Sequence, residues 1–446
     1  MSVVTRFSPS PTGYLHVGNI RVALINYLYS CKNAGKFYLR FDDTDIERSK
    51  SEYADQISKD LQWLGLVNDL EVKQSDRLDV YEKVKQKLIK SGRLYPCFET
   101  AEELAVKRKI LVSRSLPPIY DRAALKLSKD EIDKLIADGK KPHYRFLLND
   151  KETKWQDGIR GDISFKSRAF SDPVLVRENE APTYTFCSVV DDIEYNITDI
   201  IRGEDHITNT AIQIQIFEAL GGKLPRFAHL SLIKTKTGGM SKRIGGFEIM
   251  SLRERGVDAM AINSLLAKLG SSENVQPIAK MQQLVDSFAL EHFSHGAINY
   301  NEADLFEINH KLLIECEFVD VKAKLADLGL SNVSKQVWDI CKLNINNYLD
   351  LKEWVKIIEL DFQMPDFTDE EKSLLRDAAK LLPEKFEVID DFKNWINSIS
   401  NKTHKKGKML YQPLRLAVTG RSNGPELSKL LTLIDIKKLG DRLSGL

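Results

Sequence analysis

The chain has 446 residues, of which 42% are hydrophobic and 29% are charged, a balance typical of a soluble protein with several domains. Its 65 Lys and Arg stand against 64 Asp and Glu, and the net charge of +1 excludes an overall basic field that would by itself indicate a nucleic-acid or membrane partner. Any basic binding surface must therefore be local.

The five cysteines lie far apart, without the close pairs that indicate a disulfide framework or a metal knuckle. The N-terminal residues lack a cationic start followed by an apolar stretch, and the chain has no apolar run long enough to span a membrane. These features favour a reducing compartment. We expect a cytoplasmic protein that contacts no membrane.

The chain begins with a β-loop-α-β pattern. Residues 3–7 are rich in β-branched side chains, and apolar residues recur at helical spacing over 20–28, after which Gly35 is expected to end the helix. Residues 37–41 alternate like a second strand, which ends in the acidic sequence DDTD. Such a unit predicts a parallel sheet, whose ligands bind at the carboxyl ends of the strands. Both DDTD and the loop SPSPTGYLHV lie at that edge.

Between about residues 70 and 182 the pattern is irregular, with charged helical stretches and a strand-like piece at 144–148, and we expect an inserted domain. The alternation then resumes: YNITDIIRGEDH predicts a strand and a polar loop, 207–220 a helix, and FAHLSLI another strand. This order indicates a second half-sheet. No convincing strand follows Phe247, and after about residue 305 the periodicity is helical.

The first candidate site is the loop PTGYLHVGN. Gly13 and Gly18 permit close approach of the backbone to a ligand, and His16 can donate a ring N–H to a phosphate oxygen at the start of a helix. A Pro-Gly turn beside a packed histidine explains the loop better when it is taken alone, because neither common phosphate-loop pattern is present.

The second candidate site is the basic loop LIKTKTGGMSKRIGG. Residues 221–247 contain no acid and six basic side chains, namely Lys223, Arg226, Lys234, Lys236, Lys242 and Arg243. Such a loop can close on the pyrophosphate that leaves ATP during nucleotidyl transfer. Taken alone, it is explained as well by a solvated surface loop.

Together the histidine loop and the M-S-K loop resemble the paired HIGH and KMSKS signatures of class I aminoacyl-tRNA synthetases. RFSPSPTGYLHVGNIRVAL, FDDTDIERS, PTYTFCSVVDDIEYNITDIIRGEDHITNT and GMSKR more closely resemble the bacterial glutamyl-tRNA synthetase family. The resemblance runs in register from residue 6 to about residue 270 and returns in KGKMLYQPLRLAVTGRSNGPEL. It implies an α/β Rossmann-type class I catalytic core, with a doubly wound parallel sheet, an inserted α/β acceptor-binding domain and a C-terminal all-α anticodon-binding domain.

Five segments are expected on this basis. They are the first half of the Rossmann catalytic domain at 1–70, the inserted acceptor-arm-binding domain at 71–185, the second Rossmann half at 186–238, a signature-loop and stem-contact domain at 239–305, and the helical anticodon-binding domain at 306–446. A monomer is expected.

The resemblance implies ATP-dependent ligation of L-glutamate to the 3′ end of tRNA(Glu) through a glutamyl-adenylate, with release of AMP and diphosphate. Whether tRNA(Gln) is a second acceptor stays open. The amino-acid carboxylate itself attacks ATP, so catalysis consists of positioning and charge stabilisation, with Mg²⁺ sharing the phosphate charge. The expected catalytic residues are His16, which holds the phosphates, and Lys242, which stabilises the leaving pyrophosphate.

Position by position, the resemblance implies the remaining contacts. ATP is expected to contact Ser10, His16, Gly18, Asn19, Asp205, His206, Met240, Ser241, Lys242 and Arg243. Glutamate is expected to contact Arg6, Ser8, Asp42, Tyr184, Ser188 and Arg202. Arg6 and Arg202 match the positions that hold its carboxylates, and Asp42 the acid that meets its amino group. An arginine fork suits a carboxylate, whereas the amide of glutamine would present donors to donors.

Four positions depart from the family pattern. Asn19 stands at the last position of HIGH, and Gly239 replaces the first lysine of KMSKS, for which Lys234 and Lys236 are candidate substitutes. Asp42 is one methylene shorter than the usual Glu, and Ser188 stands where Asn is often found.

Zinc is not expected. Some bacterial members of the family bind zinc in the insertion through a Cys/His cluster, but Cys97 has no companion ligands in this sequence.

The C-terminal end carries the local positive charge. Residues 401–446 contain ten Lys or Arg and three Asp or Glu. With Tyr348, Trp354, Trp395 and Tyr411 as candidate stacking residues, a single-stranded RNA loop is an expected partner, and the resemblance makes it the anticodon. Two alternatives stay open: another nucleotidyl-transfer enzyme of the same superfamily, and a catalytically decayed RNA-binding or regulatory paralogue, which Gly239 suggests.

Overall fold

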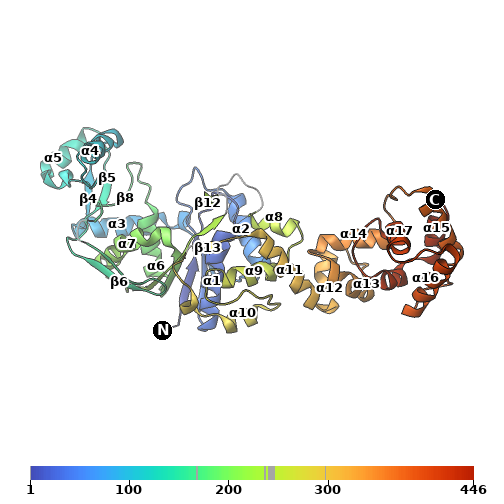
Figure 1. Ribbon diagram of the computed structural model, residues 1–446. Coiled ribbons are helices and arrows are strands. Elements are labelled where there is room, and N and C mark those ends of the chain that lie inside the picture. The colour runs from blue at the N-terminus through green and yellow to red at the C-terminus, as the bar shows by residue number, and fades with distance from the viewer. Residues whose placement is uncertain (1, 167–168, 236–237, 240–246, 297, 446) are drawn as a thin grey trace. The chain divides into compact units, whose positions relative to one another are not determined.

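The computed structural model describes most of the chain (Figure 1). The described residues are 2–166, 169–235, 238–239, 247–296 and 298–445. The chain divides into two compact units, one of Met1–Leu252 with Asn263–Asn301 and the other of Arg253–Ile262 with Glu302–Leu446. In the described part, no helix is long and apolar enough to cross a bilayer.

The predicted β-loop-α-β pattern opens the first unit. It consists of β1 (Val4–Phe7), α1 (Val17–Lys32) and β2 (Lys36–Phe41), followed by α2 (Ser51–Trp63) and β3 (Leu70–Lys73). The three strands are parallel in the order β1-β2-β3. The predicted parallel sheet is therefore confirmed, and β3 extends it by a strand that the sequence pattern did not reveal.

Helix α1 ends at Lys32 with Asn33 as its cap, and Gly35, the predicted end, closes the last turn by donating its N–H to Ser30 O at 2.8 Å. Gly35 also lies beside the start of β1, where an added Cβ atom would stand 2.3 Å from the carbonyl oxygen of Val3. Only a residue without a side chain fits so close an approach. The glycine thus allows β2 to start directly beside β1.

The second half-sheet forms as predicted. It contains α6 (Tyr184–Glu194), β9 (Asp199–Gly203), α7 (Ile207–Leu220) and β10 (Arg226–Leu230), and β9 and β10 are parallel. The half-sheet lies beside the first one, since Thr198 N donates to Val4 O at 3.0 Å and Val4 N donates to Thr198 Oγ1 at 2.8 Å. β1 and β9 therefore start together, and Arg6 and Arg202 come near their ends.

The segment between the half-sheets is a mixed α/β region, as predicted. Its elements are α3 (Leu78–Lys90), β4 (Leu94–Cys97), α4 (Ala101–Ser113), α5 (Lys129–Ala137), β5 (His143–Phe146), β6 (Thr153–Asp157), β7 (Gly161–Phe165) and β8 (Val174–Val176). β4, β5 and β8 form an antiparallel sheet of their own. β6 and β7 instead join the second half-sheet, in the order β7-β6-β10-β9. Part of the segment, β6 and β7, is thus built into the core sheet, whereas β4, β5 and β8 stand in a sheet of their own.

After β10 come a small sheet and helices. The elements are β11 (Ile233–Thr235), β12 (Gly238–Gly239), α8 (Ile249–Glu254), α9 (Ala259–Lys268), α10 (Met281–Ser287) and β13 (Ile298–Asn299). Helices α8 and α9 each contribute residues to both units. The prediction of no strand after Phe247 is wrong, because β13 pairs with β11. Two residues are too few to show the alternation by which a strand is recognised.

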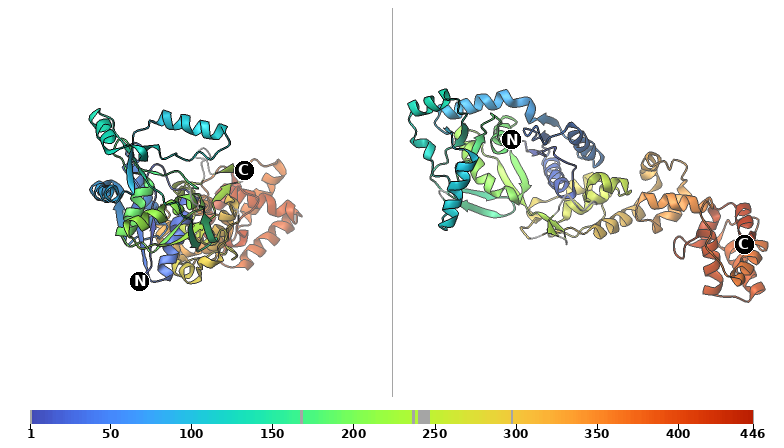
Figure 2. Two further views of the ribbon diagram at one scale, coloured as in Figure 1. Left: turned by 90° about the vertical axis from the view of Figure 1, so that its left-hand side faces the viewer. Right: turned by 90° about the horizontal axis from the view of Figure 1, so that it is seen from above.

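The regular elements that the structure describes after Asn301 are helices (Figure 2). They are α11 (Glu302–Glu315), α12 (Phe318–Asp327), α13 (Lys335–Cys341), α14 (Tyr348–Ile358), α15 (Asp369–Lys380), α16 (Ile389–Thr403), α17 (Lys408–Thr419), α18 (Leu427–Leu430) and α19 (Ile436–Ser444). Short 3₁₀ turns occur in both units, at Gln74–Arg77, Ala123–Lys126, Glu204–His206, Leu290–His292, Lys342–Asn344 and Leu431–Leu433. The predicted helical end is confirmed.

Most of the aromatic residues proposed for stacking belong to the core of this helical unit. Tyr348, Trp354 and Trp395 are buried, and Trp395 donates from Nε1 to Ala378 O at 3.0 Å. Their prediction as stacking residues is wrong, because helical spacing of aromatic residues serves packing here. Tyr411 is 45% exposed and stays available.

Candidate active site

A cavity of about 830 Å³ lies at the carboxyl ends of β1, β2 and β9. Its wall contains the predicted residues Arg6, Ser8, Ser10, His16, Gly18, Asn19, Asp42, Tyr184, Arg202, Asp205 and His206. Lys234, a candidate substitute for the missing signature lysine, also lines it. Segments from both half-sheets therefore meet at one cavity, as the strand order predicted.

Five predicted residues remain: Ser188, which is not on this wall, and four that the structure does not describe. Ser188 is fully buried, and Arg40 Nη2 donates to its Oγ at 3.3 Å. It supports the site from beneath. The other four, Met240, Ser241, Lys242 and Arg243, lie outside the described residues, as does Lys236.

His16 is the N-terminal cap of α1. Its Nδ1 accepts hydrogen bonds from Gly18 N at 3.1 Å and Asn19 N at 3.4 Å, while Asn19 Oδ1 accepts one from His16 N at 3.3 Å. Since Nδ1 is an acceptor, a neutral ring carries its proton on Nε2 and can donate it. Asn19, the departure from HIGH, thus completes a reciprocal cap that orients the histidine.

The histidine loop is tied to the end of the basic loop. Val17 N donates to Phe247 O at 3.0 Å, and Ile249 N donates to Leu15 O at 3.0 Å. His16 and Glu248 therefore face each other in a short antiparallel bridge. The residues that directly follow the basic loop thus pair with the histidine loop, more than 200 residues away in the sequence.

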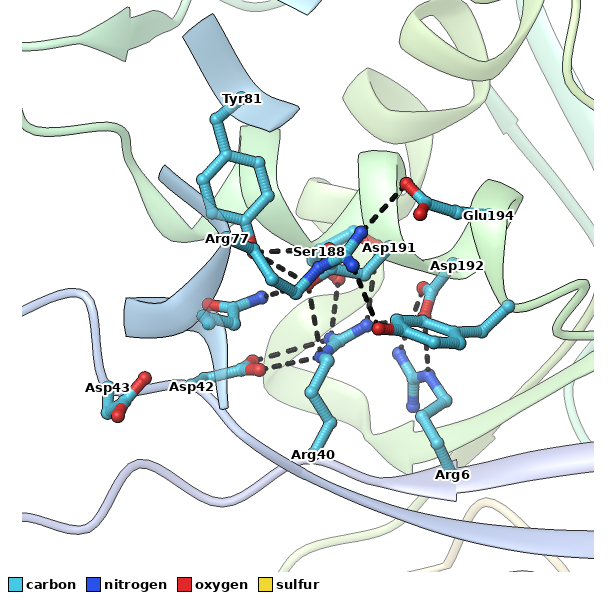
Figure 3. Close-up of polar contacts among 12 residues, drawn as sticks. Arg6, Arg40, Asp42, Asp43, Arg77, Tyr81, Ser188, Asp191, Asp192 and Glu194 are labelled. Atoms are coloured by element: carbon cyan, nitrogen blue, oxygen red, sulfur yellow. Dashed lines mark hydrogen bonds and ion pairs between the residues drawn. The ribbon is translucent and has the colours of Figure 1, made fainter. Parts of the chain in front are cut away.

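Beneath the cavity, Arg6 belongs to a buried network of charges (Figure 3). Arg6 Nε donates to Asp192 Oδ1 at 3.1 Å, and Arg40 Nη1 donates to the same oxygen at 2.7 Å. Arg40 Nε also donates to Asp42 Oδ1 at 2.8 Å. Arg40 thus links the acid behind Arg6 to the acid on the cavity wall.

The network continues to a third acid, Asp191, which is fully buried. Gln74 Nε2 donates to it at 2.7 Å, Arg77 Nε at 2.9 Å and Tyr81 OH at 2.9 Å. These donors come from the segment after β3 and from α3, and they satisfy a charge that would otherwise be very costly to bury.

Two of the acids that pair with Arg40, Asp42 and Asp192, differ in pKa. Burial raises the pKa of Asp42 to about 6, although Arg40 beside it acts in the opposite direction. Burial also acts to raise the pKa of Asp192, but Arg6 and Arg40 outweigh it, and the net shift is downward. Asp192 is therefore a permanent anion, whereas Asp42 can titrate in the mildly acid range.

Arg202 differs from Arg6 in making no salt bridge with an acid of the described residues, although Asp192 still acts on its charge from a distance. It is 5% exposed, and its guanidinium donates to three neutral oxygens: Tyr184 OH at 3.2 Å, Thr210 Oγ1 at 2.6 Å and Gln213 Oε1 at 2.7 Å. Within the described part of the chain its Nε has no hydrogen-bond partner, and burial lowers its pKa. A buried, unbalanced cation on a cavity wall favours an anionic ligand.

Sequence reasoning missed a second such cation, Arg21 on α1. It lines the cavity, its Nε donates to Leu269 O at 3.1 Å and its Nη1 to Ser231 O at 2.9 Å, and burial lowers its pKa to about 10. The signal for it is an arginine within the apolar helical sequence NIRVALIN. Sequence reasoning also missed Arg40 and the two acids that pair with it, Asp191 and Asp192. Strand alternation predicts that Arg40 is exposed, so no buried charge network is expected around it.

His206 adds a neutral polar group to the wall. Burial and the nearby Arg202 lower its pKa to about 4, so its ring is uncharged near neutral pH. The ring lies 5.6 Å from that of Tyr184, centroid to centroid. Asp205 beside it is exposed.

The described residues contain no group of three His, Cys, Asp or Glu side chains arranged to hold a metal ion. Cys97, at the position considered for zinc, is buried with its Sγ 3.8 Å from Tyr120 OH. Tyr120 OH in turn donates to Glu99 Oε2 at 2.7 Å. A hydrogen-bonded cluster thus surrounds this thiol.

Comparison with known proteins gives two family matches and several full-length relatives. Residues 2–307 match the catalytic domain of class I tRNA synthetases (E and Q), and residues 322–445 match an anticodon-binding domain. The chain is 48% identical to glutamate--tRNA ligase 1 of Rickettsia bellii over 443 residues, covering 99% of both chains. It is also 48% identical to glutamate--tRNA ligase 2 of Rickettsia canadensis over 445 residues, again covering 99% of both.

Among solved structures, the chain is similar to a glutamate tRNA ligase from Elizabethkingia meningosepticum crystallised in complex with its amino acid. The TM-score is 0.86 at 26% identity, with 100% of this chain and 99% of that chain covered. The two family matches leave few residues outside them. The chain therefore belongs to the class I tRNA synthetases of the E and Q group, with a catalytic domain followed by an anticodon-binding domain.

Proposed function

We propose that this chain is a glutamate--tRNA ligase, which joins L-glutamate to the 3′ end of tRNA(Glu) through a glutamyl-adenylate. The observation that carries the proposal is the buried Arg202, which makes no salt bridge with an acid of the described residues and shares the cavity wall with Arg6 and Asp42. The relatives named above are glutamate--tRNA ligases along their whole length, which supports the same function.

Glutamate fits these groups in charge and in number. Its two carboxylates would face Arg6 and Arg202, and its ammonium would face Asp42. The Ser8 hydroxyl, which is buried on the wall with no hydrogen-bond partner among the described residues, supplies a further polar contact, and Tyr184 lines the side chain. Ser188 is proposed to act indirectly, by holding Arg40 beneath Asp42.

ATP is proposed to lie along the start of α1. Ser10, Gly18 and Asn19 line the cavity together with His16, whose Nε2 can donate to a phosphate oxygen, and Arg21 adds buried positive charge. Asp205 and His206 lie on the wall of the same cavity. For Met240, Ser241, Lys242 and Arg243 the contacts with ATP stay predictions, with Lys242 as the cation for the leaving pyrophosphate.

Mg²⁺ is proposed to arrive with ATP, bound to the phosphate oxygens, because the described residues offer no metal-ligand group of their own. The enzyme is proposed to bind no zinc.

The enzyme is proposed to act as a monomer in the cytoplasm. No observation on the described residues favours the decayed, regulatory alternative, since the buried cations and the oriented histidine are assembled at one cavity.

Aminoacylation with labelled glutamate tests the proposal. The purified enzyme is incubated with ATP and with tRNA(Glu) or tRNA(Gln) in parallel. We expect acid-precipitable label on tRNA(Glu), dependent on ATP. The tRNA(Gln) arm decides whether that tRNA is a second acceptor. Absence of label on both tRNAs, in an enzyme that binds them, would support the decayed alternative instead.

A further inference from the structure

Arg202 is held by a chain of buried polar groups that the cavity wall does not include. Arg202 Nη2 donates to Thr210 Oγ1 at 2.6 Å, and Thr210 Oγ1 lies 2.9 Å from His229 Nε2. His229 Nδ1 in turn lies 2.5 Å from Asp157 Oδ2. Thr210, His229 and Asp157 are buried and come from α7, β10 and β6. Three separate elements thus converge behind one arginine.

The charges of this chain of groups determine where its protons lie. Burial lowers the pKa of His229, so the ring is neutral near pH 7. Burial acts to raise the pKa of Asp157, but the side chain of His229 and the backbone N–H groups of Ile159 and His229 together outweigh it and the pKa is lowered, so this carboxyl is ionised. The ring proton therefore lies on Nδ1, toward Asp157, and Nε2 is an acceptor.

Thr210 has one hydroxyl proton and two possible acceptors for it, His229 Nε2 at 2.9 Å and His206 O at 3.1 Å. With Nε2 unprotonated and closer, the proton is directed to His229. The lone pairs of Thr210 Oγ1 then accept from Arg202. Each hydrogen bond polarises the next, so the negative charge of Asp157 strengthens the hydrogen bond between Thr210 and the guanidinium.

This arrangement orients a cation without neutralising it. Arg6 has Asp192 in direct contact, which competes with any carboxylate ligand. Arg202 is oriented instead by hydroxyl, amide and phenol oxygens, and the acid of this group, Asp157, stands two hydrogen-bonded residues away. Three of its five N–H donors are used within the described residues, which leaves the Nε proton and one Nη1 proton for a ligand.

The hydrogen-bonded series of carboxylate, imidazole and hydroxyl formed by Asp157, His229 and Thr210 resembles the grouping that activates a nucleophile in some enzymes. Thr210 Oγ1 is bound to Arg202, however, and Thr210 is fully buried. The hydroxyl therefore acts on the arginine and not on substrate.

We propose that Asp157, His229 and Thr210 are positioning residues for glutamate recognition, which fix the guanidinium of Arg202 so that its remaining N–H donors meet the ligand carboxylate. This inference rests on the proposed role of Arg202. It predicts that these three residues govern the binding of the amino acid and leave the binding of ATP unchanged.

The test uses the full-length enzyme in ATP–pyrophosphate exchange with tRNA(Glu) present. Thr210→Val and Thr210→Ala remove the hydroxyl, and we expect each to raise the KM for glutamate about tenfold or more while the KM for ATP stays within about twofold. Thr210→Ser keeps the hydroxyl, and we expect its KM for glutamate to stay close to the wild-type value. The alanine variant decides the result if the valine variant does not fold.

Two further variants show whether His229 changes the KM for glutamate through the hydroxyl of Thr210. His229→Gln should raise the KM for glutamate in the wild-type background but add nothing to Thr210→Val, because both act through the same hydroxyl. Thr419→Val is the matched control, since Thr419 is a buried threonine of the helical unit whose Oγ1 donates to Arg415 O at 2.7 Å. It should change neither KM.

Arg202→Lys separates this inference from the proposed function. Arg202→Lys could raise the KM for glutamate while the KM for glutamate of Thr210→Val and Thr210→Ala stays within about twofold of the wild-type value. That result would support the role of Arg202 in binding glutamate and refute the positioning role of the three residues. Equal changes in the KM values for glutamate and ATP in the Thr210 variants would also refute it, because they indicate a general structural role. An unchanged KM for glutamate in Arg202→Lys would instead remove the proposed role of Arg202.

Discussion

Two buried arginines on the cavity wall, Arg6 and Arg202, differ in what balances their charge. Asp192 neutralises Arg6, whereas the hydrogen-bond partners of Arg202 in the described chain are neutral oxygens. A ligand carboxylate therefore gains more from Arg202, since that charge is desolvated and is not compensated by a neighbouring acid of the described residues. This asymmetry makes Arg202 the residue whose loss should affect glutamate most selectively.

Arg202→Ala should raise the KM for glutamate by about tenfold to a hundredfold, because a charge-assisted hydrogen bond is removed, while the KM for ATP hardly changes. Steady-state ATP–pyrophosphate exchange measures both values. The control is Arg226→Ala, which removes an arginine on the same half-sheet whose side chain is 68% exposed and pairs with Asp199. A parallel rise in both KM values of Arg202→Ala would argue against a carboxylate contact.

Asp42 predicts a pH dependence of glutamate binding. Burial raises its pKa to about 6, so it is ionised above this pH and protonated below it. Since only the carboxylate attracts the ammonium group, the KM for glutamate should rise as the pH falls from about 7.5 to about 5. Asp42→Asn should give a high KM with no rise over this range. A wild-type KM for glutamate that stays constant to about pH 5 would show that Asp42 does not meet the amino group.

At the scale of single elements, Gly35 determines how closely β2 starts beside β1. A Cβ atom there would stand 2.3 Å from Val3 O and 2.8 Å from Val3 Cβ, so Gly35→Ala should lower the free energy of unfolding by about 1–3 kcal/mol. Gly440→Ala is the contrast, since its Cβ would meet Leu382 Cδ1 at an ordinary 3.5 Å within α19. Thermal unfolding by calorimetry compares them, and an unchanged transition in Gly35→Ala would contradict the steric account.

The helices and the main parallel strands could be predicted because their signals are local. α7, for example, spans Ile207–Leu220 as its apolar spacing indicated. The membership of β6 in the second half-sheet and the pairing of β13 with β11 could not, because tertiary packing decides which distant strands pair. The same limit applies to Arg40, whose burial depends on Asp42 and Asp192. The motif residues could be predicted, but the network that supports them could not.

The net charge of the whole chain, +1, conceals an excess of basic residues in the C-terminal helices. Lys406, Lys408, Lys437 and Lys438 are all exposed. Because cations that bind phosphate groups release counterions, tRNA binding should depend on salt through these side chains.

The double variant Lys406→Ala with Lys408→Ala should weaken tRNA(Glu) binding. It should also reduce the slope of log affinity against log salt by about 0.7–0.9 for each phosphate that the variant no longer neutralises. The KM for ATP should not change. Lys335→Ala serves as control, since Asp339 already pairs with that lysine at 2.5 Å. Filter binding over a range of salt concentrations measures the slope, and a slope equal to that of the wild type would place the tRNA-binding lysines elsewhere.

We propose that buried cations of this cavity select glutamate by its side-chain carboxylate. ATP–pyrophosphate exchange with glutamate and with glutamine, each with tRNA(Glu) present, tests this selection. Glutamine would leave a desolvated arginine facing an amide, at a cost of about 2 kcal/mol or more, and a site built for hydrogen bonding discriminates strongly without editing. We therefore expect exchange with glutamate and a kcat/KM for glutamine lower by at least about thirtyfold. Comparable kcat/KM values for the two amino acids would contradict the claim.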